Sequence, residues 1–364
     1  MPCHTAPLSV LFSTFLLAEH FCSSISVSLS FGLEGASRKE ALLLSEPSRI
    51  HQIAAMWPSV GAAPHAALCS RPVCPGMLQI EGYGQVNLVN AFWNLPGDQA
   101  GPVHVEAVNE SNHVVPGMKG RTYFADACSP TNGFDHNQYV AMHFLGHRLR
   151  WTTDISGAGC GCNAALYLAP LKQNSDVSGC DDYYCDSNTL CGVACADIDL
   201  QEANMYAFHS TLHVFNDGTG VGAGYGGGGQ NWNHDRQWRK EDYGPGARCI
   251  DTSKPFQVAV AFPLTQDGKL RAMDVLLSQE GSPCDLSAEV SDYRPQGRDG
   301  MAELAEALAG MTPIISYWSS MEMLWMDGKG ADGLGPCEED DPSSCASSVR
   351  FYDFAFESIH LNLI

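Results

Sequence analysis

Basic residues are scarce in this chain. Its 364 residues include 20 lysines and arginines against 41 aspartates and glutamates, which gives a formal net charge of −21 at pH 7. Binding to nucleic acid or to an anionic membrane surface requires basic patches that contact phosphate groups. The composition therefore argues against nucleic acid and membranes as partners, and it is compatible with a neutral polymer.

Long apolar segments are also missing near the N-terminus. The run from Pro7 to Ala18 has the length of the central part of a secretory signal peptide, and it is too short to span a bilayer. Only His4 precedes it, where signal peptides usually have positive residues. We expect residues 1–30 to be a secretory leader, residues 31–75 to be a divergent or disordered segment, and residues 76–364 to be a single domain.

Cysteine, by contrast, is abundant. Fifteen cysteines are too many for an ordinary cytosolic enzyme and indicate an oxidising compartment, so we expect an extracellular protein. Cys180, Cys185, Cys191 and Cys195 lie close together, but their spacing is looser than the paired Cys-x-x-Cys of zinc sites. Disulfides are therefore favoured over zinc, and we expect neither a metal nor a cofactor. A hairpin could also bring Cys249 and Cys284 together.

Short alternating segments separated by Gly, Pro, Asn and Asp predict many β-strands beyond residue 76. Clear examples are Val103–Val108, Arg148–Thr153 and Gln257–Phe262. Regular turn signals between such strands favour an antiparallel sandwich. An apolar stripe predicts a helix from Gly300 to Gly310. We therefore expect an all-β fold with few short helices, and no internal repeat is evident.

Three carboxylates lie within six residues in the segment Asp197-Ile198-Asp199-Leu200-Gln201-Glu202. The alternation predicts a β-strand with Asp197 and Asp199 on one face. Glu202 has the opposite parity, unless a one-residue bulge turns it to the same face. Two carboxyl groups on either side of a sugar–sugar bond are the minimal equipment of a glycosidase. The alternatives are an acidic strand on a solvated face or an incidental calcium site.

This segment and its surroundings resemble glycoside hydrolase family 7, the fungal-type cellulases, in which Glu-x-Asp-x-x-Glu-Ala-Asn follows a pair of cysteines. The likeness covers roughly residues 117–364, whereas the first hundred or so residues show no clear match. Family members fold as a concanavalin-like β-jelly roll of two antiparallel sheets, and the resemblance implies this fold here, with the acidic strand on the concave sheet. The other similar motifs are Cys160–Tyr167, Thr211–His213, Trp232–Arg236, Tyr243–Gly246, Ile250–Phe256, Met311–Trp318 and Met323–Asp327.

The resemblance implies retaining hydrolysis of β-1,4-glucosidic bonds, with Glu202 as the acid/base, Asp199 as its hydrogen-bonding assistant and Asp197 at the nucleophile position. The family has Glu at this last position, and Asp reaches about 1.5 Å less far. A displacement of 1 Å can lower a rate on the order of a hundredfold. Three alternatives follow: either the backbone has moved inward to compensate, or the enzyme is slow, or the protein binds glucan without cutting it. A β-1,3 or mixed-linkage glucanase is a further alternative with the same carboxylate pattern.

The resemblance also implies a set of substrate-binding residues. Sugar rings stack on aromatic side chains, so Trp318 and Trp325 are candidate platforms for the leaving-group sugars, with core packing as the alternative. Asn163 and Tyr167 would line the floor, and His213 would lie near the carboxylates unless it is an ordinary core histidine. Arg236 would bind sugar hydroxyls or pair with a surface acid. The expected set is His213, Asn163, Tyr167, Thr211, Arg236, Trp318 and Trp325.

For the cysteines, the resemblance implies two nested disulfides, Cys180–Cys195 and Cys185–Cys191, and a bridge from Cys160 to Cys337 or Cys345. Five residues separate Cys185 from Cys191, where processive family members carry a long insertion.

The short loop favours an open groove and internal cleavage of cellulose, and we expect the protein to be a monomer. The glycine-dense segment 218–229 contains a nominal GxGxxG, but it lacks the strand and helix of a nucleotide site. We expect a flexible loop at the rim of the groove.

Overall fold

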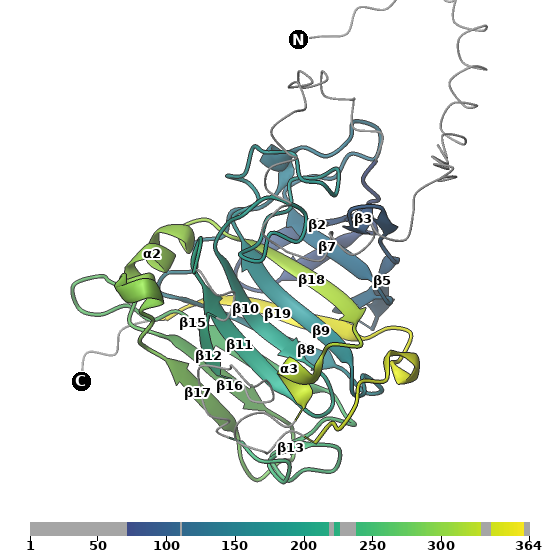
Figure 1. The fold of residues 1–364 in the computed structure, drawn as a ribbon, viewed down its shortest axis with the longest axis vertical. Helices are drawn as coiled ribbons and strands as arrows, with labels where there is room; N and C mark the ends of the chain where they lie inside the picture. Colours follow the sequence, from purple (N-terminus) through teal and green to yellow (C-terminus); the bar gives the residue numbers. More distant parts are fainter. Residues whose placement is uncertain (1–70, 110, 218–221, 226–237, 329–335, 360–364) are drawn as a thin grey trace, which may run out of the picture. The chain divides into compact units, whose positions relative to one another are not determined.

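The computed structural model describes residues 71–109, 111–217, 222–225, 238–328 and 336–359. All of the elements below belong to one compact unit, Ala66–Ile364. The expected leader and most of the expected divergent segment lie outside the described residues. The first of two large sheets has eight strands in the order β1 (Met77–Ile80), β2 (Gly84–Asn90), β7 (Gly120–Ala125), β18 (Thr312–Ser319), β9 (Cys162–Ala169), β10 (Asp197–Ala203), β11 (Phe208–His213) and β12 (Ala223–Tyr225) (Figure 1).

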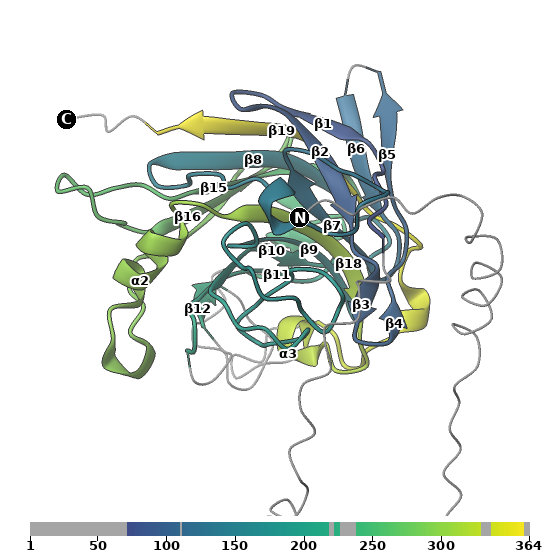
Figure 2. The ribbon, with the colours of Figure 1, turned by 90° about the horizontal axis from the view of Figure 1, so that it is seen from above.

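The second large sheet packs against the first (Figure 2). Its seven strands are, in order, β17 (Leu286–Val290), β16 (Met273–Ser278), β15 (Phe256–Ala261), β8 (His147–Asp154), β19 (Arg350–Ser358), β6 (Ser111–Pro116) and β5 (Val103–Val108). The smaller elements are β3 (Trp93–Leu95), β4 (Asp98–Gln99), β13 (Tyr243–Gly244), β14 (Ile250–Asp251), α2 (Gly300–Ala307), α3 (Leu324–Asp327) and three short 3-10 helices, His136–Gln138, Pro295–Gly297 and Pro342–Ser344. Strand pairing within both large sheets is antiparallel, so the predicted β-jelly-roll sandwich is confirmed.

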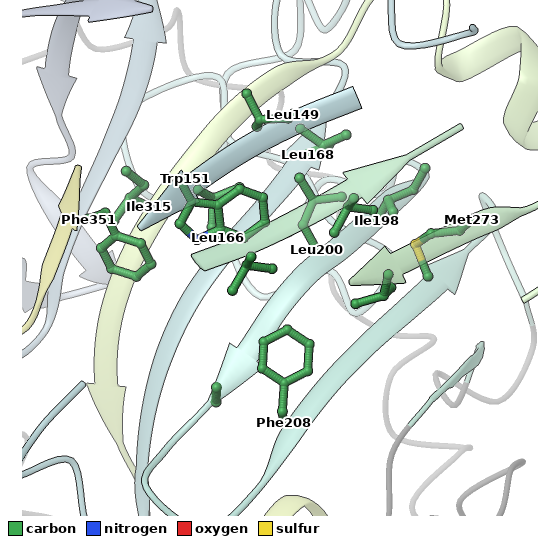
Figure 3. Close-up of a cluster of buried hydrophobic side chains, with 14 of the residues drawn as sticks. Leu149, Trp151, Leu166, Leu168, Ile198, Leu200, Phe208, Met273, Ile315 and Phe351 are labelled. Atoms are coloured by element: carbon green, nitrogen blue, oxygen red, sulfur yellow. The ribbon is translucent and has the colours of Figure 1, made fainter. Parts of the chain in front are cut away.

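Apolar side chains from both sheets fill the space between them (Figure 3). Leu149 and Trp151 alternate with more exposed residues along β8, and Ile198 and Leu200 point into the same core from β10. These four side chains are fully buried. Burial of one such side chain stabilises a fold by roughly 1.5–3 kcal/mol. The alternation thus determines which face of each strand turns inward.

The helix predicted at Gly300–Gly310 is present as α2, Gly300–Ala307. Asp299 caps it, because its carboxylate accepts a hydrogen bond from the backbone N–H of Ala302. No helix in the described part of the chain is long and apolar enough to cross a membrane.

The pairing expected for the clustered cysteines is wrong. The structure has Cys180–Cys191 and Cys185–Cys195 in place of two nested bridges. Backbone hydrogen bonds explain the difference, because Gly179 N–H donates to Cys191 O and Cys195 N–H donates to Asp186 O. These contacts place each cysteine beside its partner. Since all four are oxidised to disulfides, none offers a thiolate to zinc.

Other disulfides join distant parts of the chain. Cys160–Cys337 and Cys249–Cys284 form as expected. Two further bridges, Cys162–Cys345 and Cys74–Cys128, were not predicted. Cys162 is the first residue of β9 and Cys160 lies two residues before it, so their two bridges attach the segment after α3 to the strand beside β10.

Candidate active site

The predicted bulge in β10 is present. Asp199 pairs with Tyr167 on β9 and with Thr211 on β11. Two residues further along β10, the register on β9 has advanced by only one, and Glu202 pairs with Ala165 and His209. One extra residue therefore lies between Asp199 and Glu202, and it turns Glu202 to the face that carries Asp197 and Asp199.

Gln201 connects this bulge to the second sheet, a role that the sequence did not reveal. The buried Gln201 side chain accepts a hydrogen bond from Trp151 Nε1 at 3.1 Å. Its amide nitrogen donates to Thr153 Oγ1 at 3.3 Å and to Ala164 O at 3.2 Å. These bonds satisfy a polar side chain inside an apolar core, and they fix the bulge in one position.

The three carboxylates open onto a groove on the face of the first sheet that points away from the second sheet. The groove has a volume of about 610 Å³. Figure 2 shows α3, which carries Trp325, on this side of the first sheet. The lining residues that the sequence predicted are Asp197, Asp199, Glu202, His213, Tyr167, Trp318 and Trp325.

Hydrogen bonds orient the carboxylates. Ser187 N–H donates to Asp197 Oδ1 at 2.9 Å, and Asn163 Nδ2 donates to Glu202 Oε1 at 2.8 Å. His213 Nε2 lies 3.3 Å from Asp199 Oδ2. Asp197 and Asp199 are only 5% and 9% exposed, so water screens their charges little.

This crowding shifts the pKa values of the site. Burial raises the pKa of Glu202 well above its usual range, and the neighbouring Asp199 raises it further. Burial likewise raises the pKa of Asp197 to about 7, although His213 acts in the opposite direction. Burial alone would lower the pKa of His213, but its contacts with Asp199 and Asp217 raise that pKa well above its usual value. The site therefore combines a carboxylic acid that keeps its proton, a carboxyl that ionises more readily, and a cationic imidazole.

Not all of the predicted substrate-binding residues reach the groove. Asn163 and Thr211 are fully buried and do not line it, so Asn163 is a hydrogen-bond donor to Glu202 and not part of an exposed floor. Tyr167 lines the groove, and its hydroxyl lies 3.1 Å from the hydroxyl of Tyr184. Arg236 lies outside the described residues.

The glycine-dense segment differs from the expected rim loop where it is described. Ala223–Tyr225 forms β12, which pairs with β11. A side chain on Gly224 would meet Ser210 O at 2.3 Å, so glycine permits this close strand pairing. The rest of the segment, apart from Gly222, lies outside the described residues.

Several groove residues were not predicted. Arg121, on β7, is buried and lines the groove, with its guanidinium 4.0 Å above the ring of Tyr184. Its Nε donates to the hydroxyl of Tyr123. Asp186, on the loop that the clustered disulfides hold, lines the groove as well. The alternation in β7 indicates only that Arg121 shares a face with Tyr123, and it does not indicate which face.

No protein-family model matches the chain. Among curated proteins, the chain is 24% identical over 335 residues to Endoglucanase 1 of Pyricularia oryzae, covering 76% of this chain and 74% of the relative. It is 28% identical over 260 residues to the probable endo-beta-1,4-glucanase celB of Aspergillus clavatus, covering 57% of this chain and 61% of the relative. The match therefore spans less than two thirds of the second relative.

Solved structures share the fold. One is a GH7 family cellobiohydrolase from Daphnia pulex, with a TM-score of 0.52 and 16% identity, which covers 82% of this chain and 98% of its own. Another is a double mutant of the endocellulase EGI from Humicola insolens, also with a TM-score of 0.52 and 16% identity, which covers 81% of this chain and 99% of its own. The architecture thus agrees with the two-sheet sandwich described above.

Proposed function

We propose that the chain is a divergent member of glycoside hydrolase family 7 and that it hydrolyses β-1,4-glucosidic bonds of cellulose or a related β-glucan. The observation that carries this proposal is the bulge in β10, because it turns Asp197, Asp199 and Glu202 into one groove. The curated relatives are named as endoglucanases, which supports a glucan as the substrate class.

Glu202 is the proposed acid/base. Its raised pKa keeps the carboxyl protonated, so it can give a proton to the oxygen that leaves the scissile bond. The hydrogen bond from Asn163 holds Glu202 Oε1 and leaves the other carboxyl oxygen to face the substrate. After the leaving sugar departs, the ionised Glu202 would take a proton from the water that completes the reaction.

Asp197 is the proposed nucleophile. Its pKa of about 7 makes it the better candidate for the ionised member of the pair. The N–H of Ser187 fixes one carboxyl oxygen, and the other would attack the anomeric carbon to form a glycosyl-enzyme. Asp199 lies between the two in sequence and contacts His213, so it would supply the negative charge that helps Glu202 keep its proton. The stereochemistry of such a double displacement is retention.

The groove suits a neutral polysaccharide. Trp318 and Trp325 are partly exposed within it and would stack on sugar rings. The short loop between Cys185 and Cys191 supports an open groove and internal cleavage. Disulfide bonds and the apolar N-terminal run support secretion, and we propose that the enzyme acts outside the cell as a monomer.

Release of reducing ends from soluble carboxymethylcellulose tests the proposed function. We expect release by the wild-type protein and its loss in Glu202→Gln, whereas Glu280→Gln, an exposed position outside the groove lining, should behave as wild type. A wild-type protein that neither binds nor cuts β-glucans would overturn the proposal.

A glucan-binding protein without efficient catalysis is the second candidate. It is favoured by the short side chain of Asp197 and by a pKa that leaves this carboxyl largely protonated in mildly acidic solution. Binding without release, together with release by Asp197→Glu, would identify this case. Parallel assays on laminarin and on cellulose oligomers would separate a β-1,3 or mixed-linkage glucanase from a cellulase.

A further inference from the structure

We propose that Asp217 is a positioning residue of the reaction: it holds His213 as an imidazolium, and His213 in turn pairs with Asp199, which lies between Asp197 and Glu202 on β10. This inference rests on the proposed function. Asp217 lies four residues after His213, in the turn that follows β11, where Asn216 has a φ of 63°. The next described strand, β12, pairs antiparallel with β11.

Both ring nitrogens of His213 face a carboxylate. Nε2 lies 3.3 Å from Asp199 Oδ2, and Nδ1 lies 3.3 Å from Asp217 Oδ2. A neutral imidazole has a single N–H and can donate to only one of them, whereas the protonated ring donates to both. The geometry therefore favours the cation.

Burial strengthens this preference. His213, Asp217 and Asp199 are 5%, 7% and 9% exposed. Two buried carboxylates with no cation between them would repel each other strongly, because little water screens their charges. An imidazolium between them offsets this repulsion.

The other carboxyl groups around His213 also favour the cation, whereas Arg298, which donates to Asn216 O at 2.7 Å and to Glu303 Oε2 at 2.8 Å, opposes it from the far side of the turn. Asp197, Asp199 and Glu202 face it from β10, and Asp217 faces it from the turn. Tyr293 packs beside the turn, where its hydroxyl accepts the N–H of Val214. The fixed positive charges among the described lining residues are elsewhere. Lys119 binds Asp98, and Arg121 stacks on Tyr184.

Backbone holds Asp217 and the imidazole in place. Gly222 N–H donates to Asp217 Oδ2 at 3.0 Å. Gly222 has a φ of +68°, and a Cβ there would lie 2.7 Å from both Cε1 and Nδ1 of His213. Only glycine allows the chain before β12 to pass this close to the ring, so Asp217 and Gly222 together fix its orientation.

Loss of Asp217 would thus leave His213 with one carboxylate. The ring would release its proton at a lower pH, and the repulsion among Asp197, Asp199 and Glu202 would increase. A proton would then be taken up by this trio, and the state with an ionised Asp197 and a protonated Glu202 would become less populated. The turnover rate should fall at alkaline pH, and substrate binding through the tryptophans should change little.

The test compares Asp217→Asn with Asp285→Asn, which removes the same charge from an exposed position outside the groove lining. Nitrogen-15 NMR of the histidine rings should show both nitrogens of His213 protonated at pH 7 in the wild type, and a proton lost at a lower pH in Asp217→Asn than in the wild type. On soluble cellulose oligomers, kcat of Asp217→Asn should match wild type at pH 5 and be at least tenfold lower at pH 8, with KM unchanged. Asp217→Glu should recover part of the difference.

Identical titration of His213 in the wild type and in Asp217→Asn would overturn the proposal, whatever the activity. If Asp217→Asn does not fold, the wild-type spectrum decides, because a neutral His213 at pH 7 contradicts the inference. A wild-type protein that releases no sugar would contradict the proposed function instead. The NMR measurement would still show whether Asp217 keeps His213 protonated.

Discussion

The two faces of β10 differ in what they contribute to the molecule. Ile198, Leu200 and Ala203 point into the apolar core, and Asp197 and Glu202 face the groove. Core residues stabilise the fold through buried apolar area. The groove carboxylates do the opposite, because burial makes their ionised forms unfavourable. The core face of β10 thus stabilises the fold, whereas the buried ionisable groups on its groove face destabilise the fold and serve the reaction.

The largest expected effect concerns the groove face. In Glu202→Gln the proposed acid/base can no longer donate a proton, so kcat should fall by roughly 10²–10⁴-fold. The melting temperature should stay the same or rise, because a buried ionisable group is removed. Steady-state kinetics and circular dichroism on Glu202→Gln and Glu280→Gln check both statements. Activity above a tenth of wild type would assign the proton transfer to another group.

Protonation of Asp197 should produce the second largest effect. A nucleophile must be ionised, and the pKa of Asp197 is about 7 because the carboxyl is buried and faces Asp199. Below pH 7, kcat/KM should therefore fall about tenfold per pH unit, or roughly a thousandfold by pH 4. Measurement of kcat/KM on a soluble glucan from pH 4 to pH 9 tests this decrease on the acid side of the profile. A profile that is flat down to pH 4 would show that Asp197 does not attack.

The sequence predicts the features that depend on local pattern. Alternation predicted strands such as Val103–Val108, and β5 has these bounds. The bulge in β10 could be predicted because three carboxylates make chemical sense only on one face. The apolar stripe marks α2, although the helix ends at Ala307 instead of Gly310. Such signals lie within a few residues of the elements they describe.

Several features that depend on tertiary contacts were not predicted. Four clustered cysteines allow three pairings, and the backbone hydrogen bonds that select Cys180–Cys191 appear only in the folded loop. The sequence gives no sign that Gln201 is buried in the core, because its hydrogen-bond partner Trp151 lies 50 residues earlier in the chain. Asp217 lies four residues after His213, and its carboxylate reaches the imidazole only because the chain between them turns.

Asp197→Asn tests whether a carboxyl on the groove face lowers the stability of the folded protein. The pKa of Asp197 is about 7 in the folded protein against 3.8 for an ordinary Asp, so the folded state binds this proton more tightly than the unfolded chain. The contribution of Asp197 to stability therefore falls as the pH rises from 3.8 to 7. Asn carries no charge at any pH, and its gain over wild type should grow by about 2–3 kcal/mol between pH 4.5 and pH 8.

Denaturant unfolding at these two pH values measures the gain, with Asp285→Asn as the control for loss of one negative charge. The same gain at both pH values would mean that Asp197 ionises normally in the folded protein, and the acid limb of the activity profile would then need another origin.

The smallest expected effect concerns the core face. Gln201→Leu retains most of the side-chain volume but leaves the buried N–H of Trp151 without its acceptor, which should cost about 1–3 kcal/mol of unfolding free energy. Because no charge is involved, the loss should be the same at pH 4.5 and pH 8. Gln266→Leu, at an exposed turn, serves as the control.

A double-mutant cycle with Trp151→Phe identifies the origin of this loss. Phe has no N–H to leave unsatisfied, so the two substitutions together should destabilise less than the sum of the single changes. Strictly additive effects would mean that the hydrogen bond contributes nothing and that Gln201 acts through packing alone. A subadditive loss, together with reduced kcat in Gln201→Leu, would show that the core face of β10 sets the bulge on which the groove face depends.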